Sequence, residues 1–387
     1  MDTRHQPAFT AAEYQRRLGA LRERLQTRAI DTFLVFAPEN ICYLAGYETI
    51  GYASFATLVV RRAEDPVLLI REMERTVAET TTWLSSFATF SDTEDPVEAT
   101  GALLRGRGWL DGSVALEQNG WFVSAATMDR LRGLVEDVSD GSGLVERGRR
   151  VKSAEEIELM RRACHITEAG MDAACRAIRP GATENDVAAA AYSAMMARGS
   201  DFMAGDPIVT SGWRSGVAHC TFANRALEAG DTILLELSGC RRRYFGPLMR
   251  GGAIPPVRPE ARRVAEVIVA ALNAAIAAIR PGVTSGQVDA ACRGILEDAG
   301  YEPYFRKRTG YSVGLAFGPD WGEGHIVSLR RDDPTPLEPG MVFHVPPALR
   351  IPREYGLGFS ETVLVTETGC EVLTRFPRRL YVAGGPG

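Results

Sequence analysis

A single carboxylate in an otherwise apolar run is the residue of this sequence that most suggests chemistry. The stretch 230–250 reads GDTILLELSGCRRRYFGPLMR, and its strand-like run at 232–237 carries one charge, Glu236. Charged side chains are rarely buried without a partner or a task. A turn signal at 238–239, three arginines and a second aromatic run indicate a hairpin. Alone, the run favours a glutamate paired with an arginine; the rest of the chain favours a glutamate on the floor of an active site.

A glycine-rich stretch at 308–325 is the second place where function is expected. Long loops of this kind, dense in polar and aromatic groups, often carry binding or catalytic residues. Two apolar runs follow it, at 340–347 and 360–366, and they are predicted to be closing strands. The polar side chains of the glycine-rich stretch include Tyr311, Asp320 and His325.

Length and composition exclude several classes of protein. The chain has 387 residues, of which 45% are hydrophobic and 24% charged, as expected for a globular protein of two domains. A net charge of −5 argues against nucleic acid or an anionic membrane as the main partner. No apolar run approaches the ~20 residues of a membrane span, and residues 1–18 contain no segment of signal-peptide type. Seven scattered cysteines without a CxxC pair indicate reduced thiols, a cytoplasmic location and no zinc site.

The first part of the chain is predicted to be a mixed α/β domain, because strands alternate with helices through residue 145. A basic stretch at 146–150 marks its end, so the domains are expected to span 1–148 and 149–387. A glycine-containing loop at 46–55 carries an aromatic cluster that is either core or the lip of a pocket. The members of this cluster are Tyr47, Tyr52 and Phe55.

An internal repeat organises the second domain. The segment AIRPGAT at 177–183 returns as AIRPGVT at 278–284. In each copy an apolar helix precedes the Arg-Pro-Gly and an amphipathic helix follows it, and strands come next. A pseudo-symmetric domain of this kind usually binds its ligand at the junction of its halves. The repeat therefore predicts that Glu236 faces the elements that follow the second copy.

These features resemble the pita-bread family of creatinases, prolidases and methionine aminopeptidases. The resemblance covers nearly the whole chain, and its landmarks are Gly230-Asp231 before a strand, 310–315 in place of a GHGIGL motif, GMVF at 340–343 and LVTE at 364–367. It implies an α/β (α+β) fold in which a creatinase-type N-terminal domain precedes a pseudo-symmetric pita-bread catalytic domain. It also implies a homodimer in which the aromatic loop near Tyr47 and Tyr52 lines the partner's pocket.

The peptidases of this family hold two metal ions with two aspartates, a histidine and two glutamates. The residues of this sequence at those five positions are Glu236, Pro247, Tyr311, Pro346 and Ser360. Proline has no side-chain donor, and tyrosine and serine are poor ligands for ions that need several oxygen or imidazole groups. Because a strand alternates its faces, the adjacent Glu361 can replace Ser360 only if a bulge shifts the register. The departures predict an enzyme with no metal and no other cofactor.

Within the family, the sequence is most similar in motif to the metal-free branch of creatinase and ectoine hydrolase. The motifs are GDTILLELSGCRRRY, TGYSVGLAFGPDWGE and SETVLVT. Both enzymes hydrolyse C–N bonds of small amidine- or guanidine-bearing zwitterions, so the resemblance implies a metal-independent hydrolase acting on a non-peptide C–N bond. The loop 46–55 lacks the tryptophan of ectoine hydrolase, and Gly324-His325 also departs from it. The identity of the substrate is therefore left open.

Hydrolysing an amidine without a Lewis acid needs a base for water, an acid for the leaving nitrogen and carboxylates for the cation. His219 matches the position of the family's pocket histidine, and its pKa range suits proton shuttling. Glu236 and Glu361, on facing strands, are expected to hold the cationic group and to activate water or attack directly. Burial together would separate their pKa values into one acid and one base. The residues expected to bind substrate are Tyr311, as a hydrogen-bond donor, with Asp320, His325, His344, Tyr47 and Tyr52.

Three other functions stay open for the sequence alone. They are a lyase or rearranged activity in the same pocket, an Xaa-Pro aminopeptidase-like metallopeptidase, and a non-catalytic homologue that binds small molecules. The two glutamates and His219 argue against the last, because a relic site would have no reason to keep them together.

Overall fold

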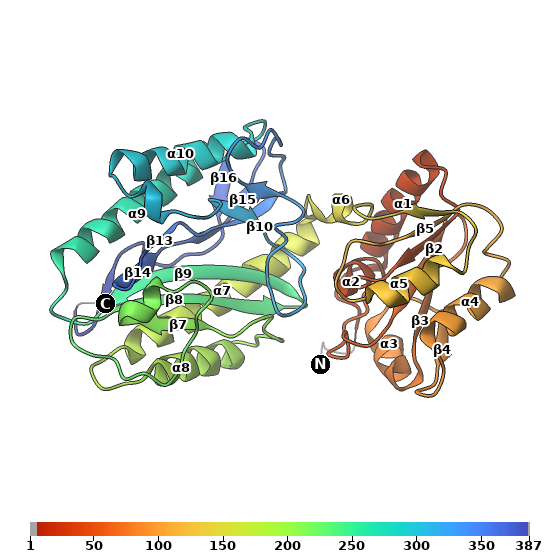
Figure 1. Cartoon of the computed structure of the whole chain (residues 1–387), viewed down its shortest axis with the longest axis horizontal. Coiled ribbons are helices and arrows are strands. Elements are labelled where there is room, and N and C mark those ends of the chain that lie inside the picture. Colours follow the sequence, from red (N-terminus) through yellow and green to blue (C-terminus); the bar gives the residue numbers. More distant parts are fainter. Residues whose placement is uncertain (1–5, 386–387) are drawn as a thin grey trace. The chain divides into compact units, whose positions relative to one another are not determined.

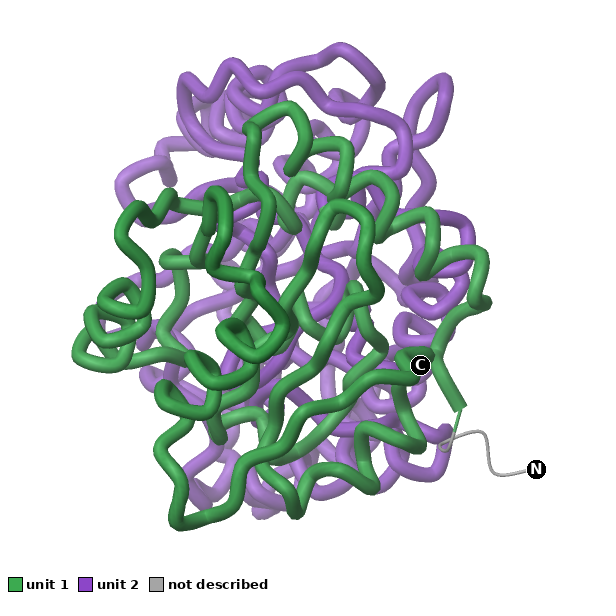
Figure 2. Tube along the Cα trace, turned by 90° about the vertical axis from the view of Figure 1, so that its right-hand side faces the viewer, with its two compact units in different colours: residues 1–149 green, residues 150–387 purple. Residues whose placement is uncertain are grey.

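The computed structural model describes residues 6–385 of the chain. The chain divides into two compact units, one up to Arg149 and the other from Arg150 (Figure 2). Each unit has buried hydrophobic clusters of its own. None of the helices within 6–385 is long and apolar enough to cross a membrane.

The first unit is built on a mixed six-stranded sheet with the strand order β4-β3-β2-β1-β5-β6. Its central strand β1 (Thr32–Val35) runs antiparallel to β2 (Thr57–Arg61) and parallel to β5 (Val114–Leu116). Because β1 is buried along its whole length, its sequence TFLV does not alternate between apolar and polar residues. The other strands are β3 (Val67–Arg71), β4 (Phe87–Phe90) and β6 (Val138–Asp140). The helices are α1 (Ala11–Thr27), α2 (Pro38–Ala45), α3 (Arg75–Thr81), α4 (Pro96–Gly106), α5 (Ala125–Arg132) and α6 (Glu146–Arg149).

The second unit consists of two helix pairs with strands between them (Figure 1). The first half comprises α7 (Ala154–Ala177) and α8 (Glu184–Ala197) with a sheet of order β17-β9-β8-β7. Its strands are β7 (Ile208–Ser211), β8 (Thr232–Arg241), β9 (Tyr244–Ala253) and β17 (Tyr381–Val382). The second half comprises α9 (Pro259–Ala278) and α10 (Ser285–Asp298) with a sheet of order β11-β10-β12-β15-β16. Its strands are β10 (Gly310–Ser312), β11 (Ser328–Leu329), β12 (Val342–Val345), β15 (Glu361–Val365) and β16 (Cys370–Val372), and β13 (Ala348–Ile351) pairs separately with β14 (Tyr355–Gly358).

The two copies of the sequence repeat make corresponding local contacts. Each copy turns at a glycine with a left-handed backbone, which only glycine adopts without steric cost, and then caps the next helix with a threonine side chain. The corresponding residues are Gly181 (φ 80°) with Gly282 (φ 81°), and Thr183 with Thr284. In both copies a leucine beyond the helix, Leu227 or Leu337, donates its backbone N–H to the turn, over 2.7 Å and 2.9 Å. The predicted pseudo-symmetry is thus a property of the backbone.

β8 and β9 form the hairpin expected for 230–250, but the predicted turn at 238–239 is wrong. β8 continues through those residues, and the turn is made by Arg242 and Arg243, whose φ angles are 52° and 65°. Positive φ at both central residues matches the right-handed twist of two-residue hairpins. Arg243 is buried, with its guanidinium over the rings of Phe202 and Phe317 at 4.3 Å from each centroid.

Close packing against α7 explains why a glycine lies inside β8. A Cβ atom on Gly239 would lie 2.5 Å from the side chain of Ile166, so any larger residue would force the helix away. Alternation along β8 sends the apolar side chains of Ile233, Leu235 and Leu237 into the core under α7 and α8. Glu236 therefore points to the opposite face of the strand.

Candidate active site

A cavity of about 1130 Å³ opens in the second unit on that opposite face of β8. It gathers residues from α8, β7, β8, β10 and β13 and from the segments at 203–206, 216–221, 304–308 and 319–321. The polar and charged residues in its lining include Glu236, His219, Tyr311, Asp320, Lys307, Arg350, Arg306, Arg308, Asp206 and Tyr192. Four residues predicted for the site, from three segments of the sequence, thus share one cavity.

Glu236 is the carboxylate at the buried side of this cavity, with 7% of its surface exposed. No residue within 6–385 donates a hydrogen bond to its side chain, and His344 Nδ1 lies 4.0 Å from Oε1, beyond hydrogen-bond distance. Burial raises the pKa of Glu236, because the charged form is poorly solvated, while the charges of Lys307 and Arg350 act in the opposite direction. Glu236 is therefore a buried carboxylate that a ligand in the cavity can satisfy.

Two cations, Lys307 and Arg350, provide the opposite charge in the cavity. Arg350 is fixed by hydrogen bonds from Nη1 to the carbonyl oxygens of Ser215 (2.9 Å) and Val217 (3.0 Å). Burial lowers the pKa of both cations, and the carboxylate of Glu236 counteracts it. The Lys307 ammonium makes no hydrogen bond or ion pair with the described part of the chain. The cavity therefore presents one buried carboxylate, Glu236, two exposed ones, Asp206 and Asp320, and at least two cationic groups to a ligand.

His219 reaches the same cavity from an exposed loop between β7 and β8. Its backbone is left-handed at φ 54°, which is uncommon for a residue other than glycine. The segment that carries it is held by contacts at its two ends.

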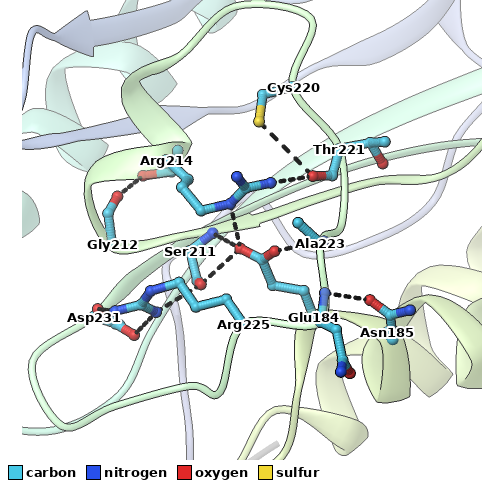
Figure 3. A network of polar contacts seen from close by, with 12 residues as sticks. Glu184, Asn185, Ser211, Gly212, Arg214, Cys220, Thr221, Ala223, Arg225 and Asp231 are labelled. Carbon is cyan, nitrogen blue, oxygen red and sulfur yellow. Dashed lines mark hydrogen bonds and ion pairs between the residues drawn. The ribbon is translucent and has the colours of Figure 1, made fainter.

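Glu184, the first residue of α8, supplies those contacts (Figure 3). Its side chain is fully buried, and Oε1 accepts hydrogen bonds from the backbone N–H and the hydroxyl of Ser211, both at 2.8 Å. Its other oxygen accepts from the backbone N–H of Ala223 at 2.9 Å, and Arg214 Nε lies 3.3 Å from Oε1. One carboxylate thus ties together both ends of the segment that carries His219.

His344 lies behind the cavity wall, and the expectation that it binds substrate is wrong. It is fully buried, with Nδ1 3.0 Å from Tyr311 Oη and Nε2 2.7 Å from Ser360 Oγ. Burial, with a further contribution from Lys307, lowers the pKa of His344 well below its usual value, so the imidazole is neutral near pH 7. Burial and the charge of Glu236 raise the pKa of Tyr311, which keeps its phenol protonated. Tyr311 itself lines the cavity.

Glu361 has a structural role, and the expectation that it faces the substrate is also wrong. Its Oε1 accepts from Arg250 Nη2 and Arg378 Nε, both at 2.8 Å, and Oε2 accepts from the Thr374 hydroxyl. Glu361 and Arg250 are each 1% exposed, and neither lines the cavity. β15 pairs with β12 without a bulge at this point, so Ser360 stays on the side of His344 and Glu361 on the other.

The two predicted residues of the glycine-rich loop differ in position. Asp320 lines the cavity, and its Oδ1 accepts from the backbone N–H of Gly322 at 3.0 Å. His325 is exposed and is not part of the cavity lining, so the expectation that it binds substrate is wrong. A Cβ on Gly324 would lie 2.4 Å from the guanidinium of Arg308, so glycine at this position leaves room for an arginine at the cavity rim.

The two tyrosines predicted from the aromatic loop of the first unit also differ in position. Tyr47 is buried in its own unit, and its hydroxyl donates to Glu74 at 3.1 Å, so it does not form an exposed lip. Tyr52 is half-buried, with its ring 6.3 Å from that of Phe122. Its predicted contact with substrate across a dimer stays a prediction.

Three residues of the site escaped the sequence reasoning. Arg350 is the one charged residue in the apolar strand β13. A single charge in an apolar strand is the same signal that indicated Glu236 on β8. Lys307 lies in the run Arg306-Lys307-Arg308 beside the glycine-rich stretch, where a cluster of cations was visible. Glu184 follows a threonine N-cap, and nothing in its sequence context distinguishes it from an ordinary first-turn carboxylate.

Comparison with known proteins identifies the family to which this chain belongs. The pattern of metallopeptidase family M24 matches residues 158–367, and that of the creatinase/prolidase N-terminal domain matches residues 17–151. The chain belongs to this family of hydrolases. The predicted fold, a creatinase-type α/β domain followed by a pita-bread domain, is confirmed.

Relatives within the family have different substrates in their names. An uncharacterized hydrolase/peptidase y4tM of Sinorhizobium fredii is 32% identical, over 97% of this chain and 98% of its own. Ectoine hydrolase of Halomonas elongata is 28% identical over 97% of this chain and 98% of its own, and an Xaa-Pro dipeptidase of Pyrococcus furiosus 26% over 94% and 99%. The crystal structure of dipeptidase PepE from Mycobacterium ulcerans is similar with a TM-score of 0.82 and 25% identity, over 97% of this chain and 99% of that chain.

The residues present do not fit the two-ion centre of the family's peptidases. Of the five ligand positions, two are prolines without donors, and the hydroxyls of Tyr311 and Ser360 are engaged with His344. Only Glu236 offers a carboxylate there. Across residues 6–385 there is no group of three or more His, Cys, Asp or Glu side chains able to hold a metal ion.

Glu184→Gln tests whether the buried carboxylate positions the His219 loop. An amide in its place has one acceptor oxygen instead of two, so the N–H of Ser211 or of Ala223 loses its partner, at a cost of about 1–3 kcal/mol. We expect a lower Tm and faster amide hydrogen exchange in residues 211–224. Glu228→Gln, which alters an exposed glutamate near the same loop, is the matched control. Unchanged exchange in this segment would show that the loop is held by other contacts.

Proposed function

We propose that this protein hydrolyses a C–N bond in a small zwitterion that carries an amidine or guanidine group, or in a cyclic amino-acid derivative, without a metal ion. The observation that carries the proposal is Glu236, a buried carboxylate that receives no hydrogen bond from the described chain and faces a cavity with Lys307 and Arg350. A cationic group of a ligand would restore the solvation that Glu236 lacks.

The charges of the cavity support a zwitterionic substrate. An amidinium or guanidinium group pairs with Glu236, and a carboxylate pairs with Arg350 and Lys307, which line the same cavity. Similarity to ectoine hydrolase over nearly the whole chain supports a non-peptide substrate of this kind.

The reaction assigns one task to each side chain. Glu236 removes a proton from water as the oxygen adds to the amidine carbon, and His219 gives a proton to the nitrogen that leaves as an amine. The C–N bond breaks, a C=O bond forms, and amidine plus water gives amide plus amine. A buried base with a raised pKa holds its proton more strongly than an exposed glutamate, which suits this step.

A second candidate is hydrolysis after Xaa in an Xaa-Pro dipeptide. It is favoured by the similarity to the Xaa-Pro dipeptidases of Pyrococcus furiosus and Pyrococcus horikoshii. Assaying both substrate classes on one preparation separates the two functions.

A homodimer and a cytoplasmic location belong to the same proposal. The dimer rests on the family resemblance and on the half-buried Tyr52 in the aromatic loop of the first unit. The location rests on seven cysteines, none of which forms a disulfide.

Glu236, which faces the cavity, and Glu361, which is paired with Arg250 outside it, provide a matched pair of variants to test the reaction. On a panel of zwitterions that includes ectoine and creatine, Glu236→Gln should lower kcat by about 10²–10⁴-fold and weaken binding, and His219→Ala should lower kcat similarly with KM mostly kept. The acid limb of kcat/KM should lie above about pH 4.5, because burial raises the pKa of the base. Glu361→Gln is the control: it should keep kcat and KM but lower the Tm, because Arg250 loses its buried charge partner. A Glu236→Gln, His219→Ala double variant with full activity would refute the assignment.

Removal of metal ions tests the absence of a metal cofactor. Protein dialysed against a chelator should keep full activity on its zwitterion, and elemental analysis should find no near-stoichiometric divalent ion. The reason is that only Glu236, of the five ligand positions, offers a carboxylate. Loss of activity on chelation with recovery on adding Mn²⁺ or Zn²⁺ would favour the peptidase function instead.

A further inference from the structure

A chain of four hydrogen bonds runs behind the cavity and ends at Tyr311. The backbone N–H of Met249 donates to Ser360 Oγ at 2.6 Å, and Ser360 Oγ lies 2.7 Å from His344 Nε2. His344 Nδ1 lies 3.0 Å from Tyr311 Oη, and Trp321 Nε1 donates to the same oxygen at 3.2 Å. Ser360 and His344 are both fully buried.

The hydroxyl proton of Ser360 decides the direction of this chain. A buried hydroxyl that donates to nothing costs free energy, and within the described residues the acceptor at hydrogen-bond distance is His344 Nε2. Nε2 therefore carries no proton, and the neutral imidazole has its proton on Nδ1. This arrangement also turns the positive N–H edge of His344 toward Glu236, 4.0 Å away.

The tautomer of His344 determines the direction in which the Tyr311 hydroxyl donates. Its oxygen accepts from His344 Nδ1 and from Trp321 Nε1, which uses both lone pairs of the phenol. The phenolic proton cannot point at either of these donors. Since Tyr311 lines the cavity, its O–H is left to donate into the cavity beside Glu236.

We propose that Tyr311 is the catalytic hydrogen-bond donor of this site, and that His344 and Ser360 are positioning residues that orient it. The inference rests on the proposed hydrolysis: the O–H donates to the oxygen that water adds to the reacting carbon, where negative charge develops. A preorganised donor takes the place of the Lewis acid that the family's peptidases use. Tyr311 and Ser360 occupy two of the five metal-ligand positions. The part of the fold that holds metal ions in the peptidases would here hold a hydrogen-bond donor that stabilises the same negative charge.

A Ser-His-Glu nucleophilic triad is the other arrangement that these side chains suggest, and the geometry opposes it. Ser360 is 0% exposed, does not line the cavity, and already accepts the N–H of Met249. A nucleophile has to reach the substrate carbon, and Ser360 Oγ cannot.

Nitrogen NMR on protein with ¹⁵N-labelled histidine tests the orientation without any substrate. The chain has five histidines, and the His344 signals are assigned by their loss in His344→Gln. We expect a neutral imidazole with Nδ1 protonated and Nε2 unprotonated from about pH 6 to pH 8. Ser360→Ala should shift His344 toward the Nε2–H form, in which Tyr311 becomes the donor to Nδ1. Ser285→Ala, which removes another fully buried hydroxyl with two hydrogen bonds, is the control and should leave the tautomer unchanged. An Nε2–H tautomer in the unmodified protein would overturn the inference.

Kinetics then separate this inference from the proposed function. Tyr311→Phe keeps the ring and removes the donor, so kcat should fall by about 10²–10³-fold with little change in KM. Ser360→Ala should lower kcat less and leave KM unchanged, while Ser285→Ala should change neither. If Tyr311→Phe keeps its kcat while Glu236→Gln loses it, the hydrolase function stands and the role of Tyr311 is refuted. If no zwitterion of the panel is hydrolysed, the proposed function falls, and the histidine tautomer still decides the orientation of Tyr311.

Discussion

The burial of Glu236 without a hydrogen-bond donor is the constraint on which the account of this site depends. A carboxylate in such a place is destabilising for the fold, because its charged form loses water and gains no partner in return. Lys307 and Arg350 reduce this cost through space, but neither forms an ion pair with Glu236 within the described residues. A protein keeps such an arrangement where the missing partner is a ligand, and strained or poorly solvated groups are typical of active sites.

The surrounding fold acts mainly to fix what reaches Glu236. Alternation along β8 sends the glutamate away from α7, and the close contact at Gly239 keeps that helix on the strand. Glu184 ties the loop of His219 to the start of α8, and in the second repeat the corresponding Ser285 ties α10 to β11 through the carbonyl of Ser328. Each half of the pseudo-symmetric unit therefore has one anchoring side chain at the same position, a carboxylate in the first half and a hydroxyl in the second.

Much of this architecture could be predicted from the sequence, since it depends on local signals. The repeat, the strands and the helix caps follow from Arg-Pro-Gly spacing, apolar runs and threonines before helices, and the structure has them. The turn of the β8–β9 hairpin was misplaced because Ser238-Gly239 is a turn signal in sequence, whereas Gly239 is needed for contact with α7. Which of two adjacent residues, Ser360 or Glu361, faces inward depends on pairing with a distant strand, and no local signal reports it. The roles of Arg350 and Lys307 could not be predicted either, because they depend on the proximity of these cations to Glu236 in the folded chain.

The dependence of stability on pH in Glu236→Gln tests the central claim most directly. The pKa of Glu236 is raised in the folded protein, so protonation stabilises the fold at low pH, and this contribution is lost as the pH rises through the folded-state pKa. Glutamine is neutral throughout. The account predicts that Glu236→Gln has a higher Tm than the unmodified protein near pH 8, and that the difference vanishes at about pH 4.5, the usual glutamate range. A variant that is less stable than the unmodified protein near pH 8 would contradict the account, since it would mean that Lys307 and Arg350 fully satisfy the carboxylate.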